Sequence, residues 1–202
     1  MRQQLEWDDQ SMWDGLINGQ QDAFTALVMH YTDVLYVYGM RLCQDEELVK
    51  DCVQEVFLFM WRRRAYLQQP ASLKFYLMKA VRNKIARDLP KWQMKGQPYE
   101  NEFNFSDFII ELEEHQDAPP AIQRQMKAYI DQLSPRQREI LYLRFYEGIK
   151  QQKIAEMMNL NNQSVYNLLR NALAALKEKV DYEALIAHLC WLVYLTSAVM
   201  NF

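Results

Sequence analysis

The chain has 202 residues, half of them apolar, and a formal net charge of −3 at pH 7. This length allows one large domain or two small ones with packed cores, and the apolar content argues against a disordered chain. Only 5 glycines and 6 prolines occur, which favours helices over sheets.

The charge is unevenly distributed along the chain. Residues 62–95 contain ten Lys and Arg and one acidic residue. Residues 99–118 contain seven acidic residues and no Lys or Arg, and residues 124–179 contain ten Lys and Arg and five acidic residues. The net charge alone argues against nucleic-acid binding, but it hides two candidate polyanion-binding surfaces with an acidic segment between them.

The cysteines and histidines indicate no metal or redox chemistry. Cys43, Cys52 and Cys190 lack metal or redox spacing, and the three histidines are too scattered for a zinc cluster or a catalytic triad. No phosphate-binding glycine loop, nucleophile motif or signal peptide is recognised. We therefore expect a reduced, cytoplasmic protein with no cofactor, no small-molecule substrate and no enzymatic activity.

Apolar residues at helical spacing predict an all-α chain that begins with a small helical domain over 1–95. After a partly helical lead over 1–18, helices are expected over 22–41, 45–66 and 72–89. The third helix stops at Pro90, because proline cannot continue a helix. Residues 96–121 are polar and acidic and are interpreted as a linker, although several apolar residues interrupt it.

A second domain is expected over 122–180. Its first helix begins at Ser134-Pro135-Arg136-Gln137, where serine caps, proline takes the first helical position and glutamine completes a capping box. This helix should end near Gly148, and helices over 151–158 and 162–179 should follow. Their spacing is that of a helix-turn-helix, with Asn159 at the turn position that needs a left-handed residue.

The 162–179 helix divides into an apolar stripe and a polar face. Hydrogen-bonding side chains of this kind read base edges and hold phosphates when the helix enters the major groove. The alternative is a plain three-helix bundle. The candidate DNA contacts are Gln163, Ser164, Tyr166, Asn167, Arg170 and Asn171.

The 45–66 helix also has two faces. An apolar stripe accounts for its core side, while Asp51, Gln54, Glu55 and Leu58 recur at i, i+3, i+4 and i+7 on another face. That face is either an ordinary solvated surface or a docking surface for a partner helix.

The 72–89 helix carries basic residues with aromatic residues between them. Lysine and arginine hold phosphates, and aromatic rings stack on unpaired bases, so this composition suits single-stranded DNA. A solubilising face is the alternative. The candidate contacts are Lys74, Phe75, Lys79, Arg82, Asn83 and Arg87.

These segments resemble a known family. Asp51-Cys52-Val53-Gln54-Glu55-Val56-Phe57, followed by Trp61, resembles the polymerase-binding helix of sigma region 2, and residues 77–83 resemble the minus-ten reading helix. Residues 133–141 and Ile154-Ala155-Glu156 resemble sigma region 4. The chain is thus similar to extracytoplasmic-function (ECF) sigma factors over 22–90 and 124–180.

The resemblance implies partners and roles. Asp51, Gln54, Glu55 and Leu58 would contact the β′ clamp helices of core RNA polymerase, whose β flap is a further expected contact. A loop over 67–74 would capture flipped bases, the following helix would read the minus-ten element, and residues 162–171 would read the minus-35 element of promoter DNA. An anti-sigma factor is a further expected partner.

The tail over 181–202 is apolar over most of its length. A span is not expected, because about 20 consecutive apolar residues are needed to cross a bilayer. Sigma factors from Bacteroidetes resemble this chain in carrying apolar tails. Our hypothesis is that the tail covers a region 2 or region 4 surface and restrains binding, so that truncation after Val180 raises affinity for polymerase or promoter.

Two other functions compete with this interpretation. A stand-alone DNA-binding regulator, such as a LuxR-type response regulator, shares much of the region 4 pattern, but its receiver domain needs alternating strands and residues 1–95 are predicted as helix only. An anti-sigma or adaptor protein would leave the polar face of the 162–179 helix unexplained.

Overall fold

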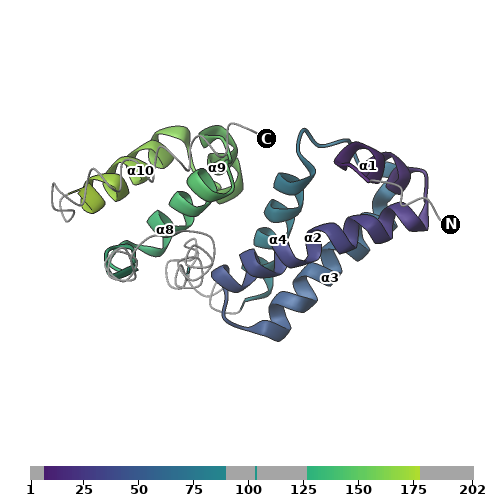
Figure 1. Cartoon of the computed structure of the whole chain (residues 1–202), viewed down its shortest axis with the longest axis horizontal. Helices are drawn as coiled ribbons and strands as arrows, with labels where there is room; N and C mark the ends of the chain where they lie inside the picture. The colour runs from purple at the N-terminus through teal and green to yellow at the C-terminus, as the bar shows by residue number, and fades with distance from the viewer. Residues whose placement is uncertain (1–6, 90–102, 104–126, 178–202) are drawn as a thin grey trace, which may run out of the picture. The chain divides into compact units, whose positions relative to one another are not determined.

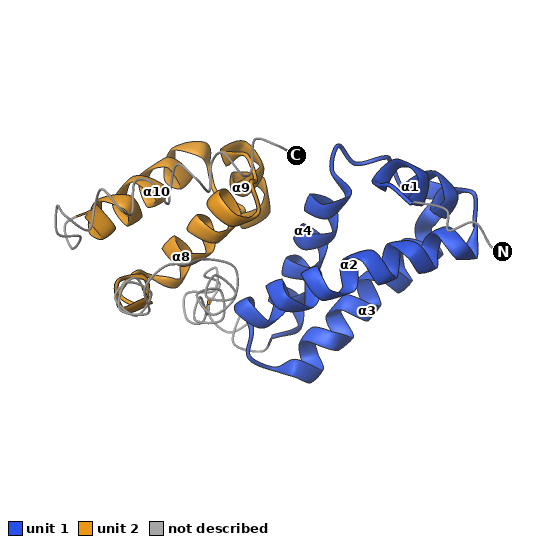
Figure 2. Cartoon of the chain, in the orientation of Figure 1, with its two compact units in different colours: residues 1–99 blue, residues 100–202 orange. Residues whose placement is uncertain are grey.

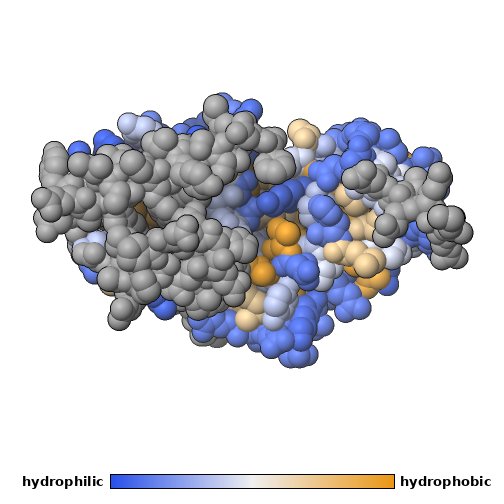
Figure 3. Space-filling model, in the orientation of Figure 1, coloured by the Kyte–Doolittle hydropathy of each residue, from blue (hydrophilic) through white to orange (hydrophobic). Residues whose placement is uncertain are grey.

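The computed structural model describes residues 7–89, 103 and 127–177, and it divides into two compact units, 1–99 and 100–202 (Figure 2). Every regular element in the described ranges is helical, which confirms the all-α prediction. The surface left visible is mostly hydrophilic, with apolar residues in small groups (Figure 3).

Within residues 7–89, the first unit contains four α-helices and one short 3-10 turn, and Figure 1 labels the α-helices. They are α1 (Asp9–Ile17), α2 (Gln21–Leu42), α3 (Glu46–Arg63), η1 (Arg64–Tyr66) and α4 (Leu73–Asp88). α2 contacts α1, α3 and α4, so it is the central element of the unit. The lead expected to be partly helical thus contains a complete short helix, α1.

Two glycines allow the helices around α2 to approach closely. A Cβ added at Gly15 of α1 would lie 2.3 Å from the Cβ of Ala23, and one added at Gly39 of α2 would lie 2.6 Å from Cγ1 of Val49. Neither side chain has room to withdraw, because Ala23 and Val49 are fully buried. Close packing at these two crossings fixes α1 and α3 against α2.

The helices α1, α3 and α4 begin at side-chain caps, whereas α2 begins without one. Asp8, Asp45 and Ser72 each accept a hydrogen bond from a backbone N–H in the first turn of α1, α3 and α4. These bonds satisfy donors that a helix leaves unpaired at its start. The cap at Ser72 sets where the basic helix α4 begins.

The second unit contains α8 (Pro135–Leu141), the π-helical turn η2 (Tyr142–Tyr146), α9 (Gln151–Met158) and α10 (Asn162–Lys177). The capping box is confirmed: Ser134 Oγ accepts from the Gln137 N–H at 3.3 Å, and Gln137 Oε1 accepts from the Ser134 N–H at 2.9 Å. The helix expected to run to Gly148 instead widens into η2 after Leu141, and Gly148 reverses the chain at φ +66°.

The turn between α9 and α10 has the predicted conformation. Asn159 adopts φ 54° and ψ 46°, in the left-handed region. Leu160 donates its N–H to the Ala155 carbonyl at 2.9 Å, and Asn161 Oδ1 accepts from the Ser164 N–H at 2.7 Å, which caps α10. The helix-turn-helix is therefore closed by backbone bonds and one side chain.

The core of the second unit is narrower than the predicted stripe on α10. Val165 and Ala172 are fully buried, whereas Leu169 and Leu176 are only partly buried and pack against a small cluster around Leu133.

Phe103 is the described residue of the segment interpreted as a linker. Its side chain is 1% exposed, and its ring centroid lies 5.6 Å from that of Tyr142 in η2. At least this position of 96–121 is a core residue of the second unit. The remainder of that segment and the tail over 181–202 lie outside the described residues. Among the helices that the structure describes, none is long and apolar enough to cross a membrane.

Candidate functional site

The predicted docking face of α3 is open to solvent. Asp51, Gln54 and Glu55 are exposed, and Leu58 is 39% exposed. The apolar stripe of α3 is buried between these positions, so the two faces separate as the spacing predicts. Phe59, which the sequence analysis did not select, is 55% exposed beside Leu58. The helical spacing places Phe59 off the buried apolar stripe of α3, and an aromatic residue at such a position indicates an exposed contact residue.

Glu55 is also tied to the neighbouring helix. Lys84 of α4 forms ion pairs with Glu55 and with Asp88, the latter at 2.7 Å. The hydrogen bond to Asp88 raises the pKa of Lys84 most, and the hydrogen bond to Glu55 raises it further. The hydrogen bond from Lys84 also lowers the pKa of Asp88. The Lys84 side chain is only 13% exposed. Lys84 therefore joins α4 to α3 from a largely covered position.

The six DNA candidates of α4 do not share one exposed face. Asn83 and Arg87 are exposed, whereas Arg82 is 7% exposed. Lys74, Phe75 and Lys79 are half-buried. The burial of Arg82 favours a structural role within the unit, because a guanidinium that contacts phosphates needs access to them. Arg82 was selected for its charge, although it lies four residues after Met78 and three before Ile85, which are both buried on the core side of α4.

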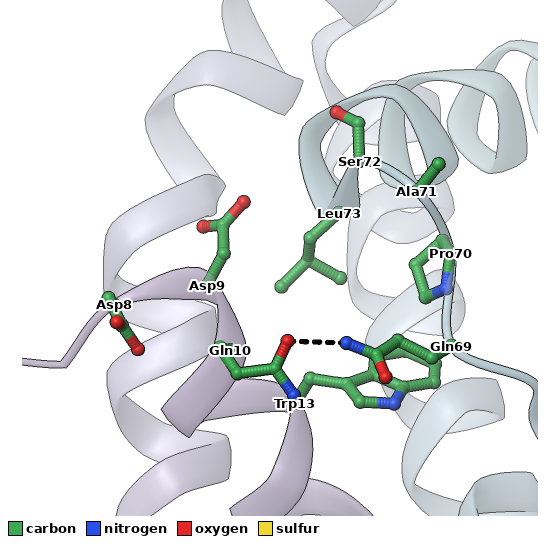
Figure 4. Close-up of a pocket in the computed structure, with 9 residues that line it drawn as sticks. All are labelled: Asp8, Asp9, Gln10, Trp13, Gln69, Pro70, Ala71, Ser72 and Leu73. Atoms are coloured by element: carbon green, nitrogen blue, oxygen red, sulfur yellow. Dashed lines mark hydrogen bonds between the residues drawn. The ribbon is translucent and has the colours of Figure 1, made fainter.

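A pocket lies where the start of α1 meets the segment before α4 (Figure 4). Its volume is about 310 Å³, and its walls come from 8–10, Trp13 and 69–73. Gln69 Nε2 donates to Gln10 Oε1 at 2.5 Å across one side of it. Trp13 is 4% exposed and makes an edge-on contact with Tyr76, with ring centroids 6.4 Å apart. The pocket thus includes much of the loop expected to capture bases, together with a wall from α1 that the sequence analysis missed.

An exposed aromatic residue stands at the start of that loop. Tyr66 in η1 is 81% exposed. Arg64 in the same turn lies over the Trp61 ring at 4.4 Å and donates to the Trp61 carbonyl at 2.6 Å, which holds the turn against α3. An exposed ring on a fixed turn can stack on an unpaired base.

The polar face of α10 is presented to solvent. Tyr166 is 50% exposed, and Gln163 Nε2 donates to Asn167 Oδ1 at 3.1 Å along the face. This arrangement leaves hydrogen-bonding groups at the N-terminal half of the helix, where a helix-turn-helix contacts bases. Of the six candidates, Gln163, Tyr166, Arg170 and Asn171 are exposed and Ser164 and Asn167 are half-buried.

Comparison with known families matches both units. Residues 27–93 match the family model Sigma-70 region 2, and residues 123–176 match Sigma-70, region 4. The chain belongs to the sigma-70 family. The two regions together cover more than half of this sigma factor, in the order and at about the positions that the sequence resemblance implied.

Two relatives support an ECF-type sigma factor. "Probable RNA polymerase sigma factor RfaY" of Xanthomonas campestris pv. campestris is 28% identical over 169 residues, which are 80% of this chain and 41% of that protein. "ECF RNA polymerase sigma factor SigK" of Mycobacterium ulcerans is 21% identical over 170 residues, 82% of this chain and 90% of that protein. This sigma factor thus spans about two fifths of the first relative and most of the second.

A solved structure shares the fold. The sigma factor RpoE from Bartonella quintana, in its co-crystal structure with the anti-sigma factor NepR, has a TM-score of 0.51 at 18% identity, covering 77% of this chain and 94% of that one. At this level of identity the similarity concerns the fold of the sigma factor.

Proposed function

We propose that this ECF-type sigma factor directs transcription initiation by binding core RNA polymerase and by recognising and melting promoter DNA. The observation that carries the proposal is the pair of sigma regions, 2 and then 4, each with an exposed face of the expected chemistry. RNA synthesis itself is the chemistry of the polymerase, and the chain needs no catalytic group of its own. We place its action in the cytoplasm, where both partners are found.

The proposed polymerase contact is the face of α3 formed by Asp51, Gln54, Glu55 and Leu58. Its exposed carboxylates and amide continue along the helix to an apolar side chain at Leu58, the composition of a surface that docks a partner helix. By the family resemblance this face meets the β′ clamp helices, and the second unit meets the β flap.

The proposed promoter contacts lie on both units. In the first unit, the loop over 67–74 captures an unpaired base. The minus-ten strand is contacted by Lys74, Lys79, Asn83 and Arg87. Arg82 stabilises the unit by packing within it. In the second, α10 reads the minus-35 element with Gln163, Ser164, Tyr166, Asn167, Arg170 and Asn171. Exposed hydrogen-bonding groups on both helices support this division.

A pull-down with core polymerase tests the first step. Asp51→Ala and Gln54→Ala should each weaken retention of the full chain at least several-fold, because truncating a central contact commonly costs about 1–2 kcal/mol. Asp33→Ala, at an exposed position on α2, is the matched control and should bind as the wild type does. Equal retention of all variants would contradict the assignment of this face.

A footprint of the reconstituted holoenzyme tests the second step. Arg170→Ala should weaken protection of the minus-35 element while leaving the polymerase pull-down unchanged. Lys177→Ala, exposed at the other end of α10, should leave the footprint unaltered. An intact footprint with Arg170→Ala would count against α10 as the reading helix.

Three finer proposals accompany the main one. An anti-sigma factor is a partner, which the complex of RpoE with NepR makes reasonable for a related fold. The chain is of a Bacteroidetes-like type, a proposal that rests on its apolar tail. The functional segments are the region 2 domain over 1–95, the linker over 96–121, the region 4 domain over 122–180 and the apolar tail over 181–202.

A further inference from the structure

Glu55, on the proposed docking face of α3, has its carboxylate held by another helix. Lys84 of α4 forms an ion pair with Glu55 Oε2, where α3 and α4 pack together in the first unit (Figure 1). The Glu55 side chain is 59% exposed, whereas that of Lys84 is 13% exposed. Lys84 therefore holds this carboxylate from the covered side, while Glu55 remains open to a partner.

Both residues of this ion pair stand on packed backbone. On α4, Val81 lies one turn before Lys84 and Ile85 directly follows it, and both side chains are fully buried. On α3, Cys52 lies one turn before Glu55 and is also fully buried. Close-packed side chains leave the helices little freedom to shift. The core of the unit thus fixes where the Lys84 ammonium group stands relative to α3.

A second carboxylate anchors the same ammonium group. Asp88, one turn further along α4, binds Lys84 Nζ at 2.7 Å. A lysine ammonium has three N–H donors, so it can serve both carboxylates at once. The Asp88 side chain is less exposed than that of Glu55. Glu55 is therefore the outer member of the cluster, which carries two negative charges and one positive charge.

We propose that Lys84 is a positioning residue for polymerase binding, because it holds the Glu55 carboxylate in the orientation that meets the partner helix. A glutamate side chain without such a contact samples several rotamers, and ordering it during association weakens binding. Lys84 orders Glu55 before the polymerase arrives, and Oε1 remains to accept from it. This inference rests on the proposed function and adds a residue outside the docking face to it.

The test is a double-mutant cycle on the dissociation constant of the full chain for immobilised core polymerase, measured by biolayer interferometry. Lys84→Met should weaken binding about three- to tenfold, the effect of ordering one long side chain on association. In a Glu55→Ala background, Lys84→Met should have no further effect. If Lys84 acted only by stabilising the fold, it would weaken binding equally in both backgrounds.

Two variants separate positioning from stability and from charge. Asp45 Oδ1 caps α3 by accepting from the Leu48 N–H at 3.1 Å, so Asp45→Ala should destabilise the unit about as much as Lys84→Met does. It should nevertheless bind polymerase as the wild type does. Lys84→Arg keeps a cation beside Glu55 and should restore most of the binding. Lys84→Met makes the face more negative, so a weaker contact with a basic partner would not be an effect of long-range attraction.

Three results would overturn the inference while leaving the proposed function intact: wild-type binding by Lys84→Met, the same loss from Lys84→Met in the Glu55→Ala background, or an equal loss in Asp45→Ala. Wild-type binding by Glu55→Ala would overturn the inference together with the place of Glu55 on the docking face. A wild-type chain that does not bind core polymerase would overturn the proposed function as well.

Discussion

Lys84 offers a direct test of how the proposed polymerase-binding and DNA-binding helices are joined. Lys84→Met would remove both ion pairs, to Glu55 of α3 and to Asp88 of α4, while keeping an unbranched apolar stem. The Glu55 and Asp88 side chains are 59% and 30% exposed, so solvent screens each pair. At about 0.2–1 kcal/mol for each pair, the free energy of unfolding should fall by about 1 kcal/mol. For a unit of this size that corresponds to a decrease in Tm of about 4–8 °C.

The pH dependence identifies the cause of that loss. The hydrogen bond from Lys84 lowers the pKa of Asp88 in the folded chain below its unfolded value of about 3.9. The ionised Asp88 therefore stabilises the fold above about pH 3.9, and this stabilisation is lost as the pH falls through the lower folded pKa. Lys84, whose pKa is raised, contributes stability below about 10.4 that is lost as the pH rises through its folded pKa. The Tm difference between wild type and Lys84→Met should therefore be constant from about pH 5 to 9 and should shrink towards pH 3.

Thermal unfolding of the full chain, followed by circular dichroism across this pH range, measures the difference. Lys50→Met is the matched control, because the ion pair that the structure describes for Lys50, with Glu46, lies within α3 at an exposed position. Its effect on Tm should be smaller than that of Lys84→Met. A Tm difference for Lys84→Met that is the same at pH 3 and pH 7, or is absent at both, would refute the role given to the ion pairs.

Three other changes test the local structure. Asn159→Ala should lower the free energy of unfolding by about 1 kcal/mol, because a side chain with a Cβ is strained at φ 54°, whereas Asn159→Gly should be neutral or slightly stabilising; denaturant titration of both decides this. Ser134→Ala should cost about 1 kcal/mol through loss of the α8 cap, and Ser134→Thr should restore most of it in the same titration. Cys52 is buried, and burial raises the pKa of its thiol to about 11, so its thiolate should react slowly with iodoacetamide at about pH 8. Peptide mapping should find Cys52 labelled only when denaturant is present. Rapid labelling of the native chain would contradict its burial.

The sequence predicted best those features that depend on neighbours along the chain. The capping box at Ser134 and the left-handed turn at Asn159 are set by a few consecutive residues, and both are present as expected. The separation of α3 into a buried stripe and an exposed face follows from helical periodicity alone. In each case the physical cause lies within one or two helical turns.

Features that depend on packing between distant segments could not be read from spacing. α1 is only 9 residues long, and its close contact with α2 at Gly15 is tertiary. The charge of Arg82 placed it among the DNA candidates, yet the surrounding helices bury it. Phe103 appeared as an apolar interruption in a polar segment, but it packs on Tyr142 in the second unit.

The candidate site shows the same division. The exposed faces of α3 and α10 could be predicted because each lies on one helix. The ion pair between Glu55 and Lys84 and the pocket between α1 and Gln69 combine groups from separate elements, so they appear only in the folded chain.

The central claim is that this chain gives core RNA polymerase its promoter specificity. The most direct measurement is in vitro transcription of genomic fragments with core polymerase, with and without the purified chain, followed by mapping of the RNA 5′ ends. We predict discrete start sites that depend on the chain and disappear with Asp51→Ala and with Arg170→Ala. The same transcripts from core polymerase alone, or no discrete start sites when a folded chain is added, would contradict the claim.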